Sequence, residues 1–224
     1  MSFGRGRIVA WFVLVGALAA ANYAVRFTQG GSTQAAGRNA VYHYSTAISA
    51  VVFYAIWFSF VYAIASVNTG ELFALRRPES WKRAIGLAVL VILALFVVNA
   101  IVSQLPLPQS PGHEQGLTPT HWRSHYAGAF AANVVALAVV APVVEELTFR
   151  GVGYRLLRPF GVPVAVLVVG VVFGLAHGLV EGLLVLVPFG ILVAWLRSRT
   201  DSVYPGMLVH ATFNGVALLS VLVR

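Results

Sequence analysis

The sequence predicts an all-α membrane protein, a polytopic transmembrane helical bundle of about seven spans. Of the 224 residues, 59% are hydrophobic and only 10% are charged, whereas soluble domains are about 25% charged. The apolar residues form continuous runs of about 20 residues, the length that crosses a bilayer as a helix. The strands of a membrane barrel would alternate polar and apolar residues, so helices are the predicted solution.

Short polar, glycine-rich or proline-rich segments separate the apolar runs. The whole chain, 1–224, is expected to form a single integral membrane domain. A polar stretch at 148–158 is expected to separate the fourth span from the fifth. The sequence contains no cysteine, which excludes disulfides, thiolate metal sites and cysteine nucleophiles. The expected spans are 8–27, 44–67, 84–105, 125–146, 162–177, 179–196 and 203–223.

The basic residues are divided unevenly between the two faces of a seven-span bundle. All but four of the 15 Lys and Arg residues fall on the side of the N-terminus. The positive-inside rule therefore predicts a cytoplasmic N-terminus. The same distribution explains the net charge of +8, so no nucleic-acid partner is expected. The four exceptions are Arg26, Arg38, Arg123 and Arg224.

Two adjacent glutamates and an arginine close the fourth apolar run. An ionised carboxylate in hydrocarbon costs several kcal/mol unless it is paired or reaches water, so these residues are candidates for a functional site. Glu146 and Arg150 are four residues apart, which predicts a buried ion pair on one helical face. Glu145 points about 100° away on a helix and has no cation nearby in sequence. The alternative is a cluster of charges that caps a span at the membrane interface.

A histidine ends the fifth apolar run. Alone, His177 could simply hydrogen-bond a neighbouring helix. If the chain turns at Gly161, however, Glu145 and His177 are both 16 residues from the turn. At about 1.5 Å per residue both then lie roughly 24 Å from it, at the same depth of an antiparallel pair. The two side chains could hold one water there, and Glu181 could orient the imidazole.

The last span carries His210 and Asn214. Their spacing of four places both on one helical face. They could form an interhelical hydrogen-bonding pair, which membrane helices use to associate. They could equally donate hydrogen bonds to a developing oxyanion, and such donors stabilise that charge strongly in a site poor in water.

Together these residues form three motifs in order on separate spans, Glu-Glu-x-x-x-Arg, Phe-x-x-x-His and His-x-x-x-Asn. The set resembles the CPBP family of intramembrane proteases (CAAX proteases and bacteriocin-processing enzymes, also called Abi), and more narrowly the type II CAAX prenyl endopeptidases. The resemblance covers 126–221, the expected catalytic core, whereas 1–105, with three less specific spans, is similar only in being hydrophobic. It implies catalytic roles for Glu145, His177, His210 and Asn214, supported by Glu146, Arg150 and Phe173.

The resemblance implies hydrolysis of a peptide bond by one of two mechanisms. In the first, Glu145 and His177 deprotonate a water, while His210 and Asn214 stabilise the oxyanion. In the second, Glu145, His177 and His210 hold a single Zn²⁺ with an open position. The cofactor is therefore either none or one zinc ion. The metal-free mechanism is favoured because no contiguous His-x-x-x-His or His-Glu-x-x-His is present.

Other classes of function remain open at this stage. The chain could be a non-catalytic membrane binding or immunity protein that confers bacteriocin resistance or acts as a scaffold. It could also be a small transporter, because buried Glu and His relay protons. For a protease, the partners are the lipid bilayer and a peptide or membrane-protein substrate. That substrate could be a prenylated C-terminal tetrapeptide, a precursor peptide, a signal remnant or a bacteriocin leader, and the expected location is a bacterial inner membrane.

Overall fold

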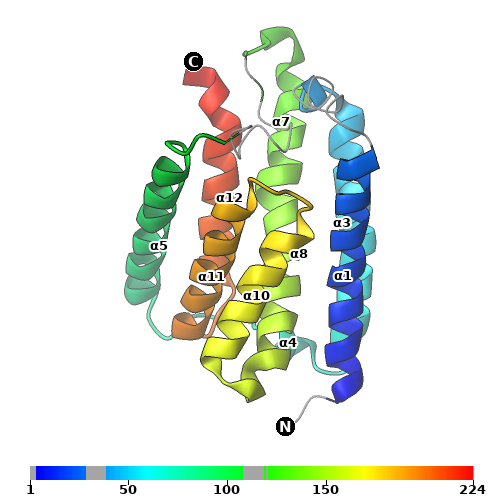
Figure 1. The fold of residues 1–224 in the computed structure, drawn as a ribbon, viewed down its shortest axis with the longest axis vertical. Helices are drawn as coiled ribbons and strands as arrows, with labels where there is room; N and C mark the ends of the chain where they lie inside the picture. The colour runs from blue at the N-terminus through cyan, green and yellow to red at the C-terminus, as the bar shows by residue number, and fades with distance from the viewer. Residues whose placement is uncertain (1–3, 29–38, 108–118, 120, 224) are drawn as a thin grey trace.

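The computed structural model describes residues 4–28, 39–107, 119 and 121–223, and the secondary structure of these residues is helical, without strands (Figure 1). The predicted all-α fold is therefore confirmed. Consecutive long helices run in opposite directions through the bundle (Figure 1). The elements are α1 (Arg5–Thr28), α3 (Tyr44–Ala65), α4 (Thr69–Phe73), α5 (Trp81–Val102), η1 (Ser124–Tyr126), α7 (Ala127–Val135), η2 (Ala136–Val140), α8 (Ala141–Glu146), η3 (Leu147–Gly153), α9 (Tyr154–Leu157), η4 (Arg158–Phe160), α10 (Val162–Ala176), α11 (Leu183–Thr200), α12 (Tyr204–Leu219) and η5 (Ser220–Val223).

Among the described residues, 6 helical stretches are long and apolar enough to cross a membrane. They are α1, α3, α5, α11 and two composite stretches, Ser124–Phe160 and Tyr204–Val223. A further apolar helix, α10, has only 15 residues. The predicted bundle of about seven spans thus consists of six full-length helices and one short helix. In Figure 1 α10 ends partway along the bundle. His177 follows directly at its C-terminal end.

The fourth stretch does not stop at the glutamates. It continues helically to Phe160, so the prediction that a polar segment at 148–158 separates two spans was wrong. Thr148 and Arg150 are fully buried and each has a hydrogen-bond partner inside the bundle, so their polarity does not interrupt the helix. The chain reverses at Gly161, whose φ of 105° is readily adopted by glycine.

Two π-helical segments, η2 and η3, flank the short α8 that carries the glutamates. A π turn contains an extra residue and occurs frequently at functional sites. Here the N-terminal helices hold one of these segments through Thr148. The indole of Trp11 donates to the Thr148 carbonyl at 2.9 Å, and that of Trp57 donates to its hydroxyl at 3.0 Å. α1 and α3 therefore fix the helix next to the glutamates.

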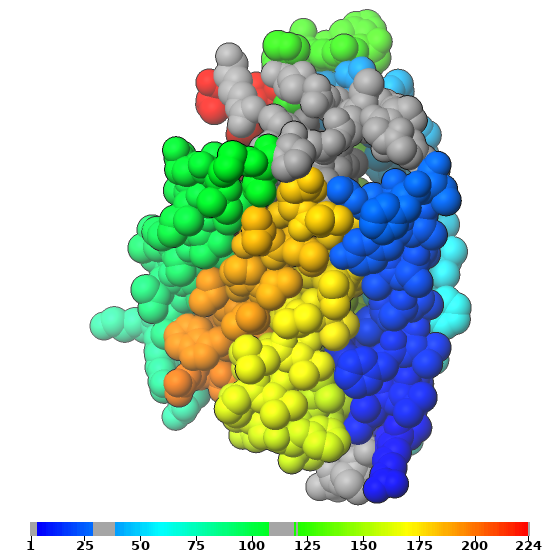
Figure 2. Space-filling model, in the orientation of Figure 1, coloured from blue at the N-terminus to red at the C-terminus, as the bar shows by residue number. Residues whose placement is uncertain are grey.

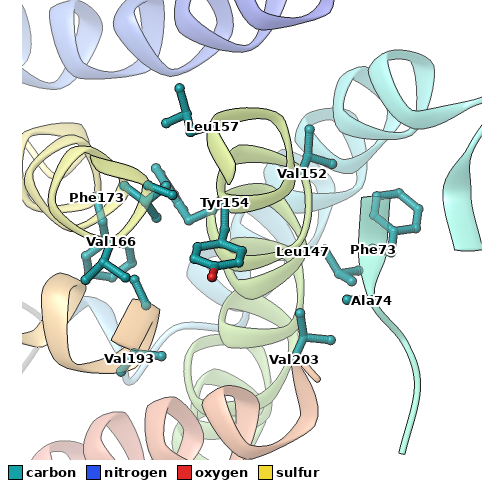
Figure 3. Packing of buried hydrophobic residues seen from close by; sticks show 14 of the residues in the cluster. Phe73, Ala74, Leu147, Val152, Tyr154, Leu157, Val166, Phe173, Val193 and Val203 are labelled. Carbon is teal, nitrogen blue, oxygen red and sulfur yellow. The ribbon is translucent and has the colours of Figure 1, made fainter. Parts of the chain in front are cut away.

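Apolar side chains of α10, α11 and the long helical stretch Ser124–Phe160 fill the interior (Figure 3). α10 and α11 approach closely at glycines. A Cβ added to Gly170 would lie 2.6 Å from the backbone nitrogen of Ile191, and one added to Gly174 would lie 2.6 Å from Val187 Cγ2. Small residues permit such close packing of membrane helices. This packing sets the depth at which α10 delivers its C-terminal histidine.

The outer face of the bundle suits contact with lipid. In the view of Figure 2, α10 and α11 lie between α1 and α5. Large apolar side chains are exposed on these helices, among them Val13, Leu93 and Leu167. So much exposed apolar surface is unusual in a soluble monomer, but is expected where the solvent is hydrocarbon.

Candidate active site

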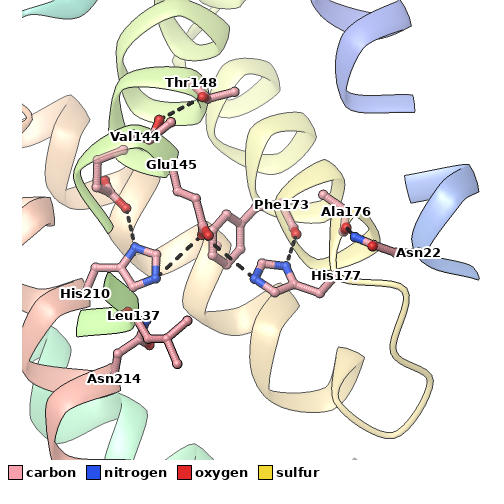
Figure 4. Close-up of polar contacts among 12 residues, drawn as sticks. Asn22, Leu137, Val144, Glu145, Thr148, Phe173, Ala176, His177, His210 and Asn214 are labelled. Atoms are coloured by element: carbon pink, nitrogen blue, oxygen red, sulfur yellow. Dashed lines mark hydrogen bonds and ion pairs between the residues drawn. The ribbon is translucent and has the colours of Figure 1, made fainter. Parts of the chain in front are cut away.

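Glu145 stands at the centre of the site, on α8, with a side chain that is 13% exposed. Its Oε1 accepts a short hydrogen bond, 2.6 Å, from the Tyr54 hydroxyl of α3. Its Oε2 lies 3.8 Å from His177 Nε2 and 3.7 Å from His210 Nε2. Although Oε2 is buried, it has no hydrogen-bond partner in the part of the chain that the structure describes. One carboxylate oxygen is therefore presented between two imidazoles (Figure 4).

His177 directly follows α10 and is held from two sides. Its Nδ1 lies 2.8 Å from the carbonyl oxygen of Phe173, one turn earlier, and donates to it in the tautomer that carries a proton on Nδ1. The N-terminal helix holds the residue before His177, since the Asn22 amide donates to the Ala176 carbonyl at 2.7 Å. Glu181, which the sequence offered as a partner for the imidazole, pairs with Arg26 at 3.2 Å.

A buried ion pair lies against the second imidazole. Arg150 Nη1 donates to Glu146 Oε1 at 2.7 Å, and His210 Nδ1 lies 3.1 Å from the same oxygen. Glu146 and Arg150 are fully buried, so the ion pair predicted from their spacing is confirmed. Gly206, near the start of α12, makes room for it, because a Cβ there would lie 2.6 Å from Glu146 Oε2.

Phe173 connects these two groups of residues. Its ring centroid lies 4.3 Å from the guanidinium carbon of Arg150 and 4.7 Å from the centroid of His177. A guanidinium is attracted to the face of an aromatic ring, most strongly where water is excluded. Phe173 therefore both stabilises the buried arginine with its ring and orients His177 with its carbonyl.

Asn214 lies one turn beyond His210 on α12, as its spacing predicts. Its Nδ2 donates to the carbonyl of Leu137, in η2, at 3.0 Å. The structure thus brings Glu145, His177 and His210 into one cluster, while Asn214 lies beside that cluster with one amide hydrogen engaged by a π-helical carbonyl (Figure 4).

The arrangement can orient a water molecule. The Nδ1 of each imidazole faces an acceptor, Phe173 O for His177 and Glu146 Oε1 for His210. When Nδ1 carries the proton, Nε2 presents its lone pair, in both cases toward Glu145 Oε2. Separations of 3.7 and 3.8 Å are too long for direct hydrogen bonds but suit a bridging water.

The same three side chains have the chemistry of a zinc site, since two imidazoles and one carboxylate are a familiar catalytic donor set. Metal-binding histidines also donate their other N–H to a carbonyl or carboxylate, as both do here. As placed, however, no group of three or more His, Asp or Glu side chains within the described ranges is close enough to hold a metal ion. The donor types fit a metal, whereas their spacing does not.

Two contacts of the site come from helices in which no residue was predicted to be functional. Tyr54 lies in an aromatic-rich span, and nothing in its local sequence distinguishes it from the neighbouring tyrosines. Asn22 did carry a signal, because an amide in an otherwise apolar span usually faces a partner rather than lipid. Both hydrogen-bond partners lie more than ninety residues away in sequence.

The fold and the site define a helical membrane protein with a carboxylate held between two histidines inside the bundle. The model of the family described as "Rce1-like: Type II CAAX prenyl endopeptidase Rce1-like" matches residues 127–216. Through this segment the chain is similar to the Rce1-like family, which confirms the predicted resemblance to the CAAX proteases. All seven motif residues lie in the matched segment, whereas Tyr54 and Asn22 lie outside it. No curated protein and no solved structure matches the chain.

Proposed function

We propose that this chain is an intramembrane endopeptidase that hydrolyses a peptide bond of a membrane-associated or precursor peptide. The family supports a membrane protease, and one observation supports this mechanism. The buried Oε2 of Glu145 lies 3.8 Å from His177 Nε2 and 3.7 Å from His210 Nε2. A water bound at that point would have two proton acceptors, Glu145 Oε2 and His177 Nε2.

In the first step Glu145 acts as the general base. The water donates one hydrogen bond to Oε2 and one to His177 Nε2, and Glu145 removes its proton as the oxygen attacks the peptide carbonyl carbon. Tyr54 already occupies Oε1, so the basic lone pair is the one that faces the histidines. The products of this step are a protonated Glu145 and a tetrahedral intermediate with a negative oxygen.

His210 then stabilises the oxyanion. In this role His210 is doubly protonated, so that Nε2–H donates to the oxyanion while Nδ1–H faces the Glu146 carboxylate 3.1 Å away. The second N–H of the Asn214 amide supplies another donor. One such donor in a preorganised site contributes roughly 3–4 kcal/mol to transition-state stabilisation. Collapse of the intermediate breaks the C–N bond, and the leaving amine takes the proton held by Glu145.

The zinc alternative uses Glu145, His177 and His210 as ligands. A bound zinc ion would supply Lewis acidity and a water of lowered pKa. The structure offers the donors but not the spacing, so the steps above involve only the chain's own residues.

The decisive test compares purified wild type with Glu145→Gln and His177→Ala on a peptide library with farnesylated and unmodified C-termini. Glu145→Gln keeps the size of the side chain but removes the base, so we expect cleavage to fall by more than about 100-fold. Glu79→Gln is the matched control, because this carboxylate lies in the loop before α5. The control variant should cleave the peptides like the wild type.

Full activity of Glu145→Gln would remove the mechanism. A non-catalytic immunity or scaffold protein would instead cleave no peptide in the wild type and would keep its cellular phenotype with Glu145→Ala.

A further inference from the structure

A second polar site lies at the end of the bundle where the long helix turns into α10 and where α11 ends. It is a cavity of about 480 Å³, within the usual size range of small-molecule sites. No residue of the Glu145 site lines it. The lining residues used below are Tyr154, Arg155, Arg158, Pro159, Arg197 and Asp201.

The cavity is lined by three arginines and one carboxylate. Asp201 is shared by two cations, since it accepts from Arg197 Nη1 at 2.8 Å and lies 3.3 Å from Arg76 Nε. Arg155 pairs with Glu71 outside the lining, at 2.9 Å. Each carboxylate near the cavity is thus already engaged by arginine.

Arg158 differs from the other two lining arginines. It is exposed on η4, and the residues that the structure describes provide it with no ion pair. Its guanidinium therefore leaves an excess of positive charge at one wall. Arginine matches tetrahedral oxyanions well, because its planar fork donates two hydrogen bonds to a phosphate.

We propose that this cavity binds a phosphate group, with the headgroup of an anionic phospholipid as its source. The cavity opens at an end of the bundle, the level at which headgroups lie beside a spanning helix. The next side chain after Pro159 is Phe160, an apolar ring that is 60% exposed. A basic cavity beside exposed apolar surface recognises the phosphate and the acyl chains of one molecule.

The test uses the full chain purified in a neutral detergent. Its thermal unfolding midpoint is measured during titration with phosphatidylglycerol, phosphatidylcholine or inorganic phosphate. We expect phosphatidylglycerol to raise the midpoint saturably and phosphatidylcholine to leave it unchanged. Arg158→Gln should weaken the apparent affinity for phosphatidylglycerol roughly fivefold, the effect of one arginine near an anionic headgroup.

Arg83→Gln is the matched control, since Arg83 is also exposed at this end of the bundle but does not line the cavity. It should bind phosphatidylglycerol like the wild type. If inorganic phosphate alone raises the midpoint and Arg158→Gln abolishes that effect, the site takes free phosphate rather than lipid. Equal behaviour of the two variants, or no response to any phosphate, would overturn the proposal. Peptide cleavage is not measured, so the result is independent of the proposed protease activity.

Discussion

The hydroxyl of Tyr54 offers the sharpest test of how the site is oriented. It donates to Glu145 Oε1 at 2.6 Å from a helix outside the family-matched segment. Tyr54→Phe removes this one oxygen and keeps the ring, leaving Oε1 buried without its donor. If the proposed mechanism holds, the carboxylate loses the contact that directs Oε2 toward the histidines.

The size of the effect follows from the bond. A hydrogen bond to a charged group contributes about 1.5–3 kcal/mol. If that contribution is lost in the transition state, kcat should fall by about 10- to 100-fold. KM should change little, because Tyr54 acts through Glu145 rather than through the substrate.

The assay measures kcat and KM of purified enzyme on a cleavable peptide, with the thermal unfolding midpoint recorded in parallel. Tyr62→Phe is the control, since Tyr62 lies two turns later on the same helix, is exposed, and contacts Phe73 through its ring. It should retain wild-type kinetics. Wild-type kcat in Tyr54→Phe, or equal losses in both variants, would refute the reasoning.

Three further predictions concern the buried ion pair, the N-terminal helix and metal. Arg150→Met leaves the Glu146 carboxylate buried without its cation and should destabilise the protein by about 3–5 kcal/mol; chemical denaturation measures this, and the double variant with Glu146→Gln should recover part of the loss. Asn22→Leu removes the hydrogen bond to the Ala176 carbonyl, which contributes about 1 kcal/mol, so kcat should fall severalfold. The control is Asn68→Leu, at the other end of the bundle, which should affect only stability. Prolonged treatment with a chelator should leave cleavage unchanged under the metal-free mechanism; loss of activity restored by Zn²⁺ would assign the three-ligand alternative to Glu145, His177 and His210.

The sequence predicted those features that depend on composition and on distance along a helix. Continuous apolar runs revealed the membrane helices because a segment in hydrocarbon must satisfy its backbone hydrogen bonds internally, which a helix does. Equal distances from Gly161 placed Glu145 level with His177, and their side chains do lie 3.8 Å apart. The spacing of Glu146 and Arg150 likewise predicted their ion pair, which the structure shows.

Features that depend on tertiary context could not be predicted in this way. The π turn of η2 occurs in alanine- and valine-rich sequence, whereas that of η3 occurs in mixed sequence with two glycines, so no shared local pattern reveals them. Tyr54 is one of several aromatic residues on α3, and only the packing of that helix selects it. The polar residues at 148–158 suggested a boundary between two spans because their partners, such as Trp57, belong to distant helices.

Two contacts of the site come from helices outside the segment that matches the family model, and this affects whether that segment could function alone. A fragment limited to residues 127–216 would contain every motif residue through which the chain resembles the Rce1-like family. It would still lack the phenol that braces Glu145 and the amide that steadies the chain before His177. We therefore expect excised or grafted versions of that segment to be inert, because the N-terminal helices α1 and α3 hold the catalytic side chains in position.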